Sequence, residues 1–325
     1  MRILAVDDEP LFLELLEAAL RDLGFTDVTP IYSAKEALRE LEAGKKGFDC
    51  ILLDIRMPGM SGVELCRNIR AIAGHKRTPI MMVTALTDRA YIDDAFAAGA
   101  SDYLTKPLDP LELKVRMSMI ERLIAEQSRN IFLEQSVEAS AEDDDAEDDI
   151  DTLDFDFAAA VPMPGLDRII DWPAMENYLS SLPVKDSYAA AVFAVSIRNA
   201  AAFFACASRV DYMNMLHDLG VTLESVLKRH EAMISHAGRG VFVVATIGTQ
   251  EPDVQRIEGQ IRERLEDYRQ IYDRDGLPMP EIAVGQAVRK SLFSRPNAGD
   301  LLRAAMASVE RPAVLLPAAA VLQTA

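Results

Sequence analysis

The stretch CILLDIRMPGMSGVEL, residues 50–65, decides the fold of the N-terminal part of the chain. It opens with the apolar run Cys50–Leu53, which does not alternate polar with apolar side chains and so suits a strand covered on both faces of a parallel sheet. The run leads directly into an acidic residue, Asp54, and apolar residues at helical spacing begin at Leu65. This order predicts a buried strand with a carboxylate at its end, followed by a covering helix.

The same unit recurs through the first 120 residues. Similar apolar runs, the second of them weaker, lie at Ile3–Val6, Val28–Ile31, Ile80–Val83 and Tyr103–Thr105. Segments with apolar residues three and four positions apart lie between these runs, and several of them stop at glycine. Strand–helix alternation with short connections predicts an α/β fold, a doubly wound five-stranded parallel sheet with right-handed crossovers.

Polar side chains follow most of these predicted strands, namely Asp7-Asp8, Asp54, Thr84 and Lys106. Ligands of open α/β sheets bind outside the carboxyl ends of the strands, so we expect these side chains to converge. Crowded carboxylates raise each other's pKa unless a cation lies among them, and several hard oxygen ligands suit Mg²⁺. A strand-terminal aspartate is also a common helix N-cap, but this explanation does not account for five such residues at successive strand ends.

Residues 1–122 resemble the receiver domain of two-component response regulators. The resemblance rests on ILAVDDEP, CILLDIRMPGMSGVEL, PIMMVTA and DYLTKPLDPLEL, and no catalytic position departs from the family pattern. It implies that Asp54 accepts a phosphoryl group from the phosphohistidine of a sensor histidine kinase or a phosphotransfer protein.

The resemblance also implies a role for each neighbouring residue. Asp7, Asp8, Asp54 and the backbone carbonyl of Arg56 would hold Mg²⁺. Lys106 would pair with the acyl phosphate, with a cis peptide before Pro107 aiming its ammonium group. Thr84 would donate its hydroxyl to a phosphoryl oxygen, and Tyr103 would be the aromatic residue whose ring follows that movement inward.

A helix beginning near Asp109 is predicted to run past the end of a lone receiver. Its apolar seam, with one polar position, consists of Leu113, Met117, Ile120, Ile124, Gln127 and Ile131. The heptad spacing predicts pairing of two chains in a homodimer, and packing on the chain's own receiver is the alternative. Residues 126–157 then carry thirteen acidic residues and one basic residue, typical of a solvated linker.

Composition excludes several classes of function. The net charge is −18, of which this acidic segment supplies −12, and no basic patch suits direct binding of nucleic acid. Cys50, Cys66 and Cys206 are too few and scattered for a disulfide framework or zinc site, which indicates a reducing compartment. The most apolar window, residues 188–207, is interrupted by Arg198-Asn199 and predicts a strand running into a helix rather than a membrane span. With no signal peptide before the first strand, we expect a cytoplasmic protein.

A second domain is expected at residues 166–325, after the receiver at 1–122 and a helical and acidic connector at 123–165. Its predicted elements alternate as β-α-β-β-α-β, the order of a ferredoxin-like core. They are a helix start at residues 171–173, strands at 189–197, 233–236, 241–246 and 282–288, and helices at 210–229, 253–272 and 299–308.

Residues 185–325 resemble the catalytic domain of class III nucleotide cyclases, through VFAVSIRNAAAF, RHEAMISHAGRGVFVV and AGDLLRAAMASVERPAVLL. The two metal-binding aspartates of that family correspond to Ser196 and Arg239, and its catalytic asparagine and arginine correspond to Arg303 and Ala307. A diguanylate cyclase, which has a related fold, is the alternative, with residues 238–242 in place of its Gly-Gly-Asp-Glu-Phe signature. Neither alignment keeps the carboxylates that two-metal catalysis needs.

We therefore expect a signalling protein rather than an enzyme. Its degenerate cyclase-like domain would act by dimerisation or by binding a downstream protein. Two alternatives stay open: a nucleotide cyclase regulated by phosphorylation, and a nucleotide-binding sensor without turnover.

Overall fold

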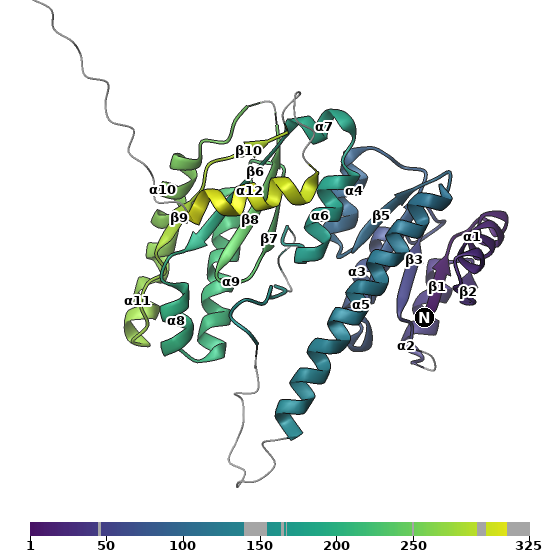
Figure 1. Ribbon diagram of the computed structural model, residues 1–325, viewed down its shortest axis with the longest axis horizontal. Coiled ribbons are helices and arrows are strands. Elements are labelled where there is room, and N and C mark those ends of the chain that lie inside the picture. Colours follow the sequence, from purple (N-terminus) through teal and green to yellow (C-terminus); the bar gives the residue numbers. More distant parts are fainter. Residues whose placement is uncertain are drawn as a thin grey trace, which may run out of the picture.

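Two five-stranded sheets, joined by a helix that contacts both, organise the chain (Figure 1). The computed structural model describes residues 1–44, 47–139, 155–163, 166, 168–248, 250–290 and 297–310, without the side chains of 125–139 and 310. Of the predicted acidic linker at 126–157, residues 126–139 belong to a helix and 140–154 lie outside the described residues.

The first sheet confirms the predicted doubly wound parallel architecture. Its order is β2-β1-β3-β4-β5, with all neighbours parallel. The strands are β1 (Arg2–Val6), β2 (Asp27–Ile31), β3 (Cys50–Leu53), β4 (Ile80–Thr84) and β5 (Asp102–Thr105). Every residue of β3 and β4 is buried, because helices cover both faces of the sheet.

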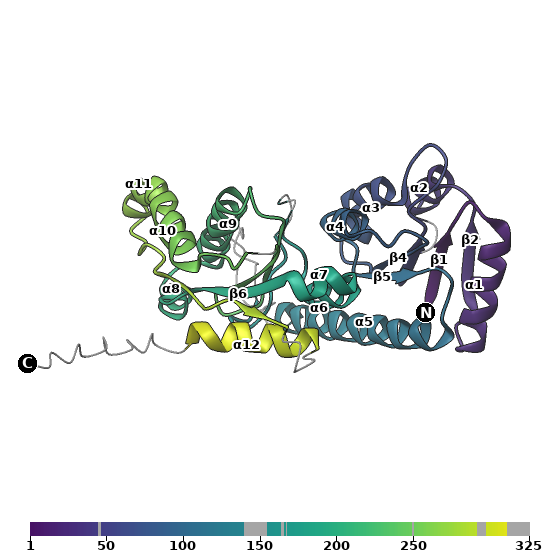
Figure 2. The same ribbon diagram turned by 90° about the horizontal axis from the view of Figure 1, so that it is seen from above.

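The helices of this domain divide between the two faces of the sheet (Figure 2). One apolar core joins the sheet to α1 (Pro10–Asp22) and α5 (Pro110–Ala139). The opposite core joins it to α2 (Ala34–Glu42), α3 (Gly62–Ala71) and α4 (Arg89–Ala97), with the short η1 (Ala73–His75) after α3. A capping box between Ser61 and Glu64 fixes the start of α3. Gly62 is required there, because a Cβ atom would lie 2.0 Å from the Asp54 carbonyl oxygen.

The second sheet is antiparallel throughout, in the order β10-β6-β8-β7 with β9 also paired to β6. Its strands are β6 (Ala190–Ile197), β7 (Ala232–His236), β8 (Val241–Ile247), β9 (Ile282–Val284) and β10 (Val288–Arg289). One face packs on α8 (Ala200–Cys206), α9 (Arg209–Val226), α10 (Val254–Leu265) and α11 (Arg269–Arg274). The other packs on α6 (Trp172–Ser181) and α12 (Ala298–Glu310), and α7 (Val184–Ala189) leads into β6.

Three predicted elements of this domain are wrong in detail. The strand expected at residues 282–288 is two strands, because Gly285 lies against α12, where an added Cβ would be 2.2 Å from the Ser308 hydroxyl. The helix expected at 210–229 ends at Val226, and α8, which was not predicted, precedes it. The polar helix expected at 253–272 is interrupted by the 3-10 turn η2 (Glu266–Tyr268).

Helix α6 joins the two sheets, and it lies between them in both views (Figures 1 and 2). It contacts α4 and β5 of the first domain and β7 and α12 of the second. Tyr178 is almost fully buried, its ring packs edge-on against Phe96 at 5.5 Å, and its hydroxyl donates to Asp93 at 2.9 Å. The Asn177 side-chain amide donates to the Ser101 carbonyl at 2.9 Å. One apolar core therefore runs through the junction of the domains.

The predicted dimer seam on α5 is partly used within the chain. Leu113, Met117 and Ile120 are buried in the first domain's own core, and Ile124 packs against it. The side chains of Gln127 and Ile131 lie outside the described residues. The described part of the seam thus follows the alternative, packing on the chain's own receiver.

Candidate functional site

The ammonium group of Lys106 lies between two carboxylates at the carboxyl edge of the first sheet. Its Nζ is 2.6 Å from Asp7 Oδ2 and 3.1 Å from Asp54 Oδ1. The three residues follow β1, β3 and β5, so the parallel register brings them to one edge, as the sequence predicted. The peptide bond before Pro107 is cis, which also confirms the prediction.

Burial sets the electrostatics of this site. Asp7 and Asp54 are only 2% and 6% exposed. Burial raises the pKa of Asp54, the charge and hydrogen bond of Lys106 lower it, and the charge of Asp7 raises it again. Burial opposes the charge of Lys106, but its contacts with Asp7 and Asp54 leave its pKa raised. The ammonium group also lies 3.8 Å from the centroid of the Phe12 ring, a contact that was not predicted from the sequence.

Backbone N–H groups hold both carboxylates in place. The Arg56 N–H donates to Asp54 Oδ2 at 2.6 Å, and the Glu9 N–H donates to Asp7 Oδ1 at 2.9 Å. Each bond uses one oxygen and leaves the other toward Lys106. The site therefore presents one oxygen of each carboxylate to a shared cation.

Thr84 and Tyr103 are linked through the loop after β4. Thr84 is fully buried, and its hydroxyl oxygen accepts a long bond of 3.4 Å from the Leu86 N–H. The Tyr103 hydroxyl donates to the Leu86 carbonyl at 2.5 Å, and burial raises the pKa of this phenol. The Tyr103 ring is buried. Thr84 and Tyr103, the two residues that were predicted to switch, therefore both bond to the backbone of Leu86.

The predicted magnesium ligands are only partly assembled. Asp7 and Asp54 come together, whereas Asp8 is exposed. Within the described residues there is no group of three or more histidine, cysteine, aspartate or glutamate side chains that could hold a metal ion. Two buried carboxylates that share one ammonium group are nevertheless hard oxygen donors of the type Mg²⁺ prefers, so this donor set fits the ion.

A second buried ion pair, which was not predicted from the sequence, lies beside Tyr103. Asp102 is 1% exposed, and its Oδ1 accepts from Arg116 of α5 at 2.7 Å and from the Tyr103 N–H at 2.8 Å. Burial raises the pKa of Asp102 to about 6, although the charge of Arg116 lowers it. An aspartate at the start of a strand gives no sequence signal for such a pair, because its partner lies 14 residues further along, in the following helix α5.

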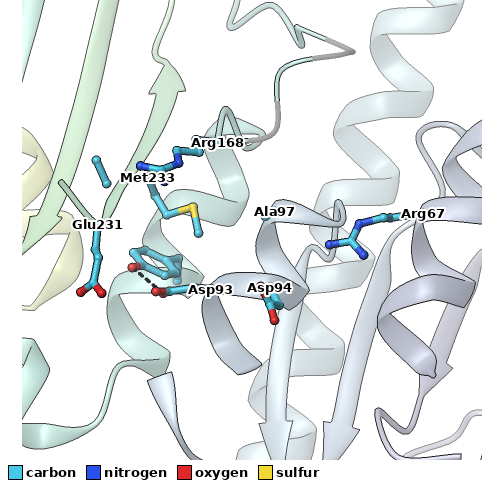
Figure 3. A pocket seen from close by; sticks show the side chains of 9 residues that line it. Arg67, Asp93, Asp94, Ala97, Arg168, Glu231 and Met233 are labelled. Atoms are coloured by element: carbon cyan, nitrogen blue, oxygen red, sulfur yellow. Dashed lines mark hydrogen bonds between the residues drawn. The ribbon is translucent and has the colours of Figure 1, made fainter. Parts of the chain in front are cut away.

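A cleft of about 380 Å³ lies in the junction between the domains (Figure 3). Acidic and basic side chains of both domains line it together with Tyr178, whose bond to Asp93 is drawn in the figure. Arg89 pairs with Asp93 of its own helix and with Glu231 of the second domain. These contacts hold the junction together, and no local sequence pattern indicates them.

The residues at the predicted cyclase positions lie on three separate elements. Ser196 is in β6 opposite Val241, and Arg239 is exposed at the tip of the β7–β8 hairpin. Arg303 is exposed on α12 and pairs with Asp300 at 2.6 Å, and Ala307 is exposed one turn further on. The Arg239 N–H donates to the carbonyl of Phe157 at 2.8 Å, so residues from before the second domain cover its hairpin.

Comparison with known proteins places the first domain. Residues 3–118 match the model of the response regulator receiver domain. The chain is 42% identical over 119 residues to the DNA-binding response regulator MtrA of Mycolicibacterium smegmatis, covering 36% of this chain and 48% of MtrA. It is 40% identical over 125 residues to the chemotaxis protein CheY-3 of Vibrio cholerae, covering 38% of this chain and 94% of CheY-3.

A solved structure is also similar to the first domain. It is the receiver domain of the sensor histidine kinase PA1611 of Pseudomonas aeruginosa, described with a magnesium ion in its active-site cleft, at 35% identity and a TM-score of 0.34. The match covers 38% of this chain and 97% of that one. No helix in the described part of the chain is long and apolar enough to cross a membrane. The matched segment spans about half of MtrA but nearly all of CheY-3, and through it the chain belongs to the response regulators of two-component systems, with a receiver domain at residues 3–118.

Proposed function

We propose that the chain relays a phosphorylation signal, with Asp54 as the phosphoacceptor and a histidine kinase or phosphotransfer protein as the donor. The observation that carries this proposal is the Lys106 ammonium group, which bridges the buried carboxylates of Asp7 and Asp54. A cation held against a carboxylate nucleophile is the arrangement that phosphoryl transfer needs, because negative charge must be neutralised as it gathers.

In this reaction an Asp54 carboxylate oxygen forms a bond to phosphorus as the bond from phosphorus to the donor imidazole nitrogen breaks. The imidazole leaves with the electron pair and takes up a proton from water. Mg²⁺, held by Asp7, Asp54 and Asp8 with the Arg56 carbonyl, would supply charge neutralisation at the phosphoryl oxygens. Lys106 would then pair with the phosphoryl group. This group adds negative charge beside Asp7, whose carboxylate already repels that of Asp54.

The junction supplies a route for the signal to the second domain. Thr84 and Tyr103 both bond to Leu86, and α6 packs on β5, the strand of Tyr103. A rearrangement of the loop after β4 on phosphorylation would therefore change the surface against which α6 packs. Signalling would follow through dimerisation or through a downstream protein.

The second domain fits a degenerate cyclase-like module, which we place at residues 166–325, after a receiver at 1–122 and a connector at 123–165. The support is the strand order β10-β6-β8-β7 with antiparallel neighbours, which is the order of a ferredoxin-like sheet. Ser196 and Arg239 at the metal-ligand positions argue against cyclase activity, because neither supplies a carboxylate for two-metal catalysis and the fixed charge of the arginine would repel a cation.

The test is acid-stable labelling of the full chain by radioactive acetyl phosphate with Mg²⁺. We expect stoichiometric label in the natural chain and in the control Asp49→Asn, whose half-buried carboxylate is bound by Arg2 away from the site. We expect none in Asp54→Asn, and persistent label in that variant would remove Asp54 from this role.

Incubation with ATP or GTP and Mn²⁺ should give no cyclic product by mass spectrometry. A product that survives Ser196→Ala and Arg239→Ala would show that the cyclase alignment is misplaced.

A further inference from the structure

Residues 155–163, here called the strap, cross the second domain beside its β7–β8 hairpin. Two phenylalanine rings of the strap pack against two aromatic rings of the second domain. The Phe155 centroid lies 5.8 Å from Phe204 and 6.0 Å from Tyr212, and the Phe157 centroid lies 5.2 Å and 6.2 Å from the same rings. Phe204 and Tyr212 pack edge-on at 4.9 Å. Contacts of this geometry stabilise beyond simple burial of apolar area.

The second domain binds the backbone of the strap as well as its rings. The carbonyl of Phe157 accepts from the Arg239 N–H at 2.8 Å, and the Val161 N–H donates to His236 Nδ1 at 2.9 Å. The Asp156 carboxylate accepts from the Ala158 N–H at 2.9 Å, which shapes the strap as a turn. The hairpin turn, residues 238–240, together with Phe204, Tyr212 and His236, forms what we call the strap-binding surface.

The strap-binding surface is shaped for close approach of a peptide backbone. Gly238 has a φ of +87°, and a Cβ atom there would lie 2.2 Å from the Ala158 carbonyl oxygen. Cationic side chains border the surface: the Arg209 guanidinium lies 3.7 Å from the Phe204 centroid, and Arg239 is exposed. An aromatic surface with a cationic border suits a segment in which two phenylalanines flank an acid, as they do in the strap.

The strap leaves polar groups beneath it without partners. Among the atoms that the structure describes, the Tyr212 hydroxyl and His236 Nε2 are buried and make no hydrogen bond. Between the strap and the other residues that the structure describes, two hydrogen bonds are formed. A small number of hydrogen bonds distinguishes the strap from the paired strands β7 and β8 beside it, and indicates a segment that can be exchanged.

We propose that the strap-binding surface is a peptide-recognition site, and that its partner is the strap of a second copy of this chain. Each copy already carries a segment that fits, so an exchange keeps every contact and adds only the cost of association. Residues 140–154, fifteen in number, join α5 to the strap. Fully extended, this segment spans at most about 50 Å, whereas the five-residue step from Met163 to Arg168, whose carbonyl pairs with Ile234 of its own β7, spans at most about 18 Å. An exchange therefore requires the second domains of the two copies to lie side by side. The contact does not depend on phosphorylation, so its failure would leave the phosphoacceptor proposal intact.

The test is complementation between two full-length variants with fluorescent labels. Phe155→Ala/Phe157→Ala removes the strap rings and keeps the surface. Gly238→Ala keeps the strap and blocks the surface, and Gly276→Ala, with a φ of +68° but no atom near its Cβ position, controls for backbone strain alone. We expect energy transfer when the two disabled variants are mixed. Neither alone should show it, and the natural chain should need roughly tenfold more protein because its own strap competes.

No energy transfer in the complementary mixture would overturn the proposal, provided that both variants keep native hydrogen exchange in β6–β8. Phe204→Ala replaces Gly238→Ala if that variant loses protection. A synthetic peptide of residues 154–163 should bind the strap variant, whereas a peptide with both phenylalanines changed to alanine should not. Peptide binding without complementation would mean that the strap occupies the surface only within its own chain, and would overturn the proposal of a second copy.

Discussion

At the edge of the receiver sheet three charged side chains meet within hydrogen-bonding distance, whereas at the hairpin of the second sheet four aromatic rings meet instead. The receiver loops after β1, β3 and β5 hold two carboxylates and one ammonium group together at the edge of the sheet, largely buried. The hairpin of the second sheet is crossed by the strap, through bonds to Arg239 and His236. One sheet edge of this chain thus holds charged groups and the other holds aromatic rings. The difference arises because a connecting segment, the strap, covers the second edge.

The difference also predicts where each edge is fragile. The receiver edge depends on balanced charge in a buried place, where one missing partner is costly. The hairpin edge depends on apolar contact and on one neutral histidine, so it should respond to acid rather than to loss of a cation.

Loss of the Lys106 cation should give the largest effect. In metal-free buffer at pH 8, Lys106→Met should lower the free energy of unfolding of the receiver by roughly 3–5 kcal/mol, because Asp7 and Asp54 keep their buried charge without a partner. Urea titration followed by hydrogen exchange in β1, β3 and β5 measures it. Adding Asp54→Asn should recover part of the loss, and a double variant no more stable than Lys106→Met would contradict the charge argument.

Acid should destabilise the hairpin of the second sheet through protonation of His236, a mechanism that the receiver edge does not share. Burial lowers the pKa of His236 to about 4 from 6.5, so the unfolded chain takes up a proton first as the pH falls. The contribution of neutral His236 to the free energy of unfolding is therefore fully present above pH 6.5. It is lost as the pH falls toward 4, and the loss is about 3 kcal/mol at most. Protonation would also remove the Nδ1 acceptor of Val161.

Exchange of β7 and β8 amides across this pH range tests the role of His236. His236→Gln should flatten the slope relative to the natural chain, because glutamine does not titrate. His217→Gln, at an exposed position of α9, should leave it unchanged. An equal slope in all three chains would remove His236 as the cause.

How far the sequence predicts each edge follows from the same contrast. Four of the five receiver strands carry their own signal, an apolar run followed by one or two polar residues of the site, so Asp54, Thr84 and Lys106 could be located from the sequence alone. That Asp8 faces solvent while Asp7 does not could not be predicted, because two adjacent aspartates give the same pattern. Local pattern therefore predicts which residues reach an edge, and packing decides which of them turn inward.

At the second edge and at the junction the decisive contacts are not local. Phe157 meets Phe204 across nearly fifty residues, and Tyr178 meets Asp93 across 85. An acidic run containing phenylalanine predicted a solvated linker, and only the fold shows where its last residues return. The strands of the second sheet were predictable from their apolar runs, but the break at Gly285 was not, because it depends on where α12 crosses.

The junction between the two regions should be sensitive to single hydroxyl groups. Tyr178→Phe removes the bond to Asp93 and leaves that half-buried carboxylate with Arg89 alone, which should cost about 1–2 kcal/mol. Hydrogen exchange in α4 and α6 should rise. Tyr272→Phe is the matched control, because it removes a tyrosine–aspartate bond of 3.1 Å that lies wholly within the second domain. Equal responses of α4 to both variants would mean that the junction bond does not couple the domains.

The smallest expected effect is a gain in stability at the hairpin. Arg239 is the one described residue other than glycine with a positive φ, at +54°, a conformation that costs L-residues about 1 kcal/mol. Arg239→Gly should therefore stabilise the second domain by roughly 0.5–1 kcal/mol and keep the N–H bond to Phe157. The same change at Arg274, in the last turn of α11, should destabilise by a similar amount, since glycine weakens a helix. Urea midpoints of both variants measure these changes. A loss of stability at both positions would mean that the Arg239 side chain holds the strap, and the cationic border of the strap-binding surface would then be a structural requirement as well as a preference.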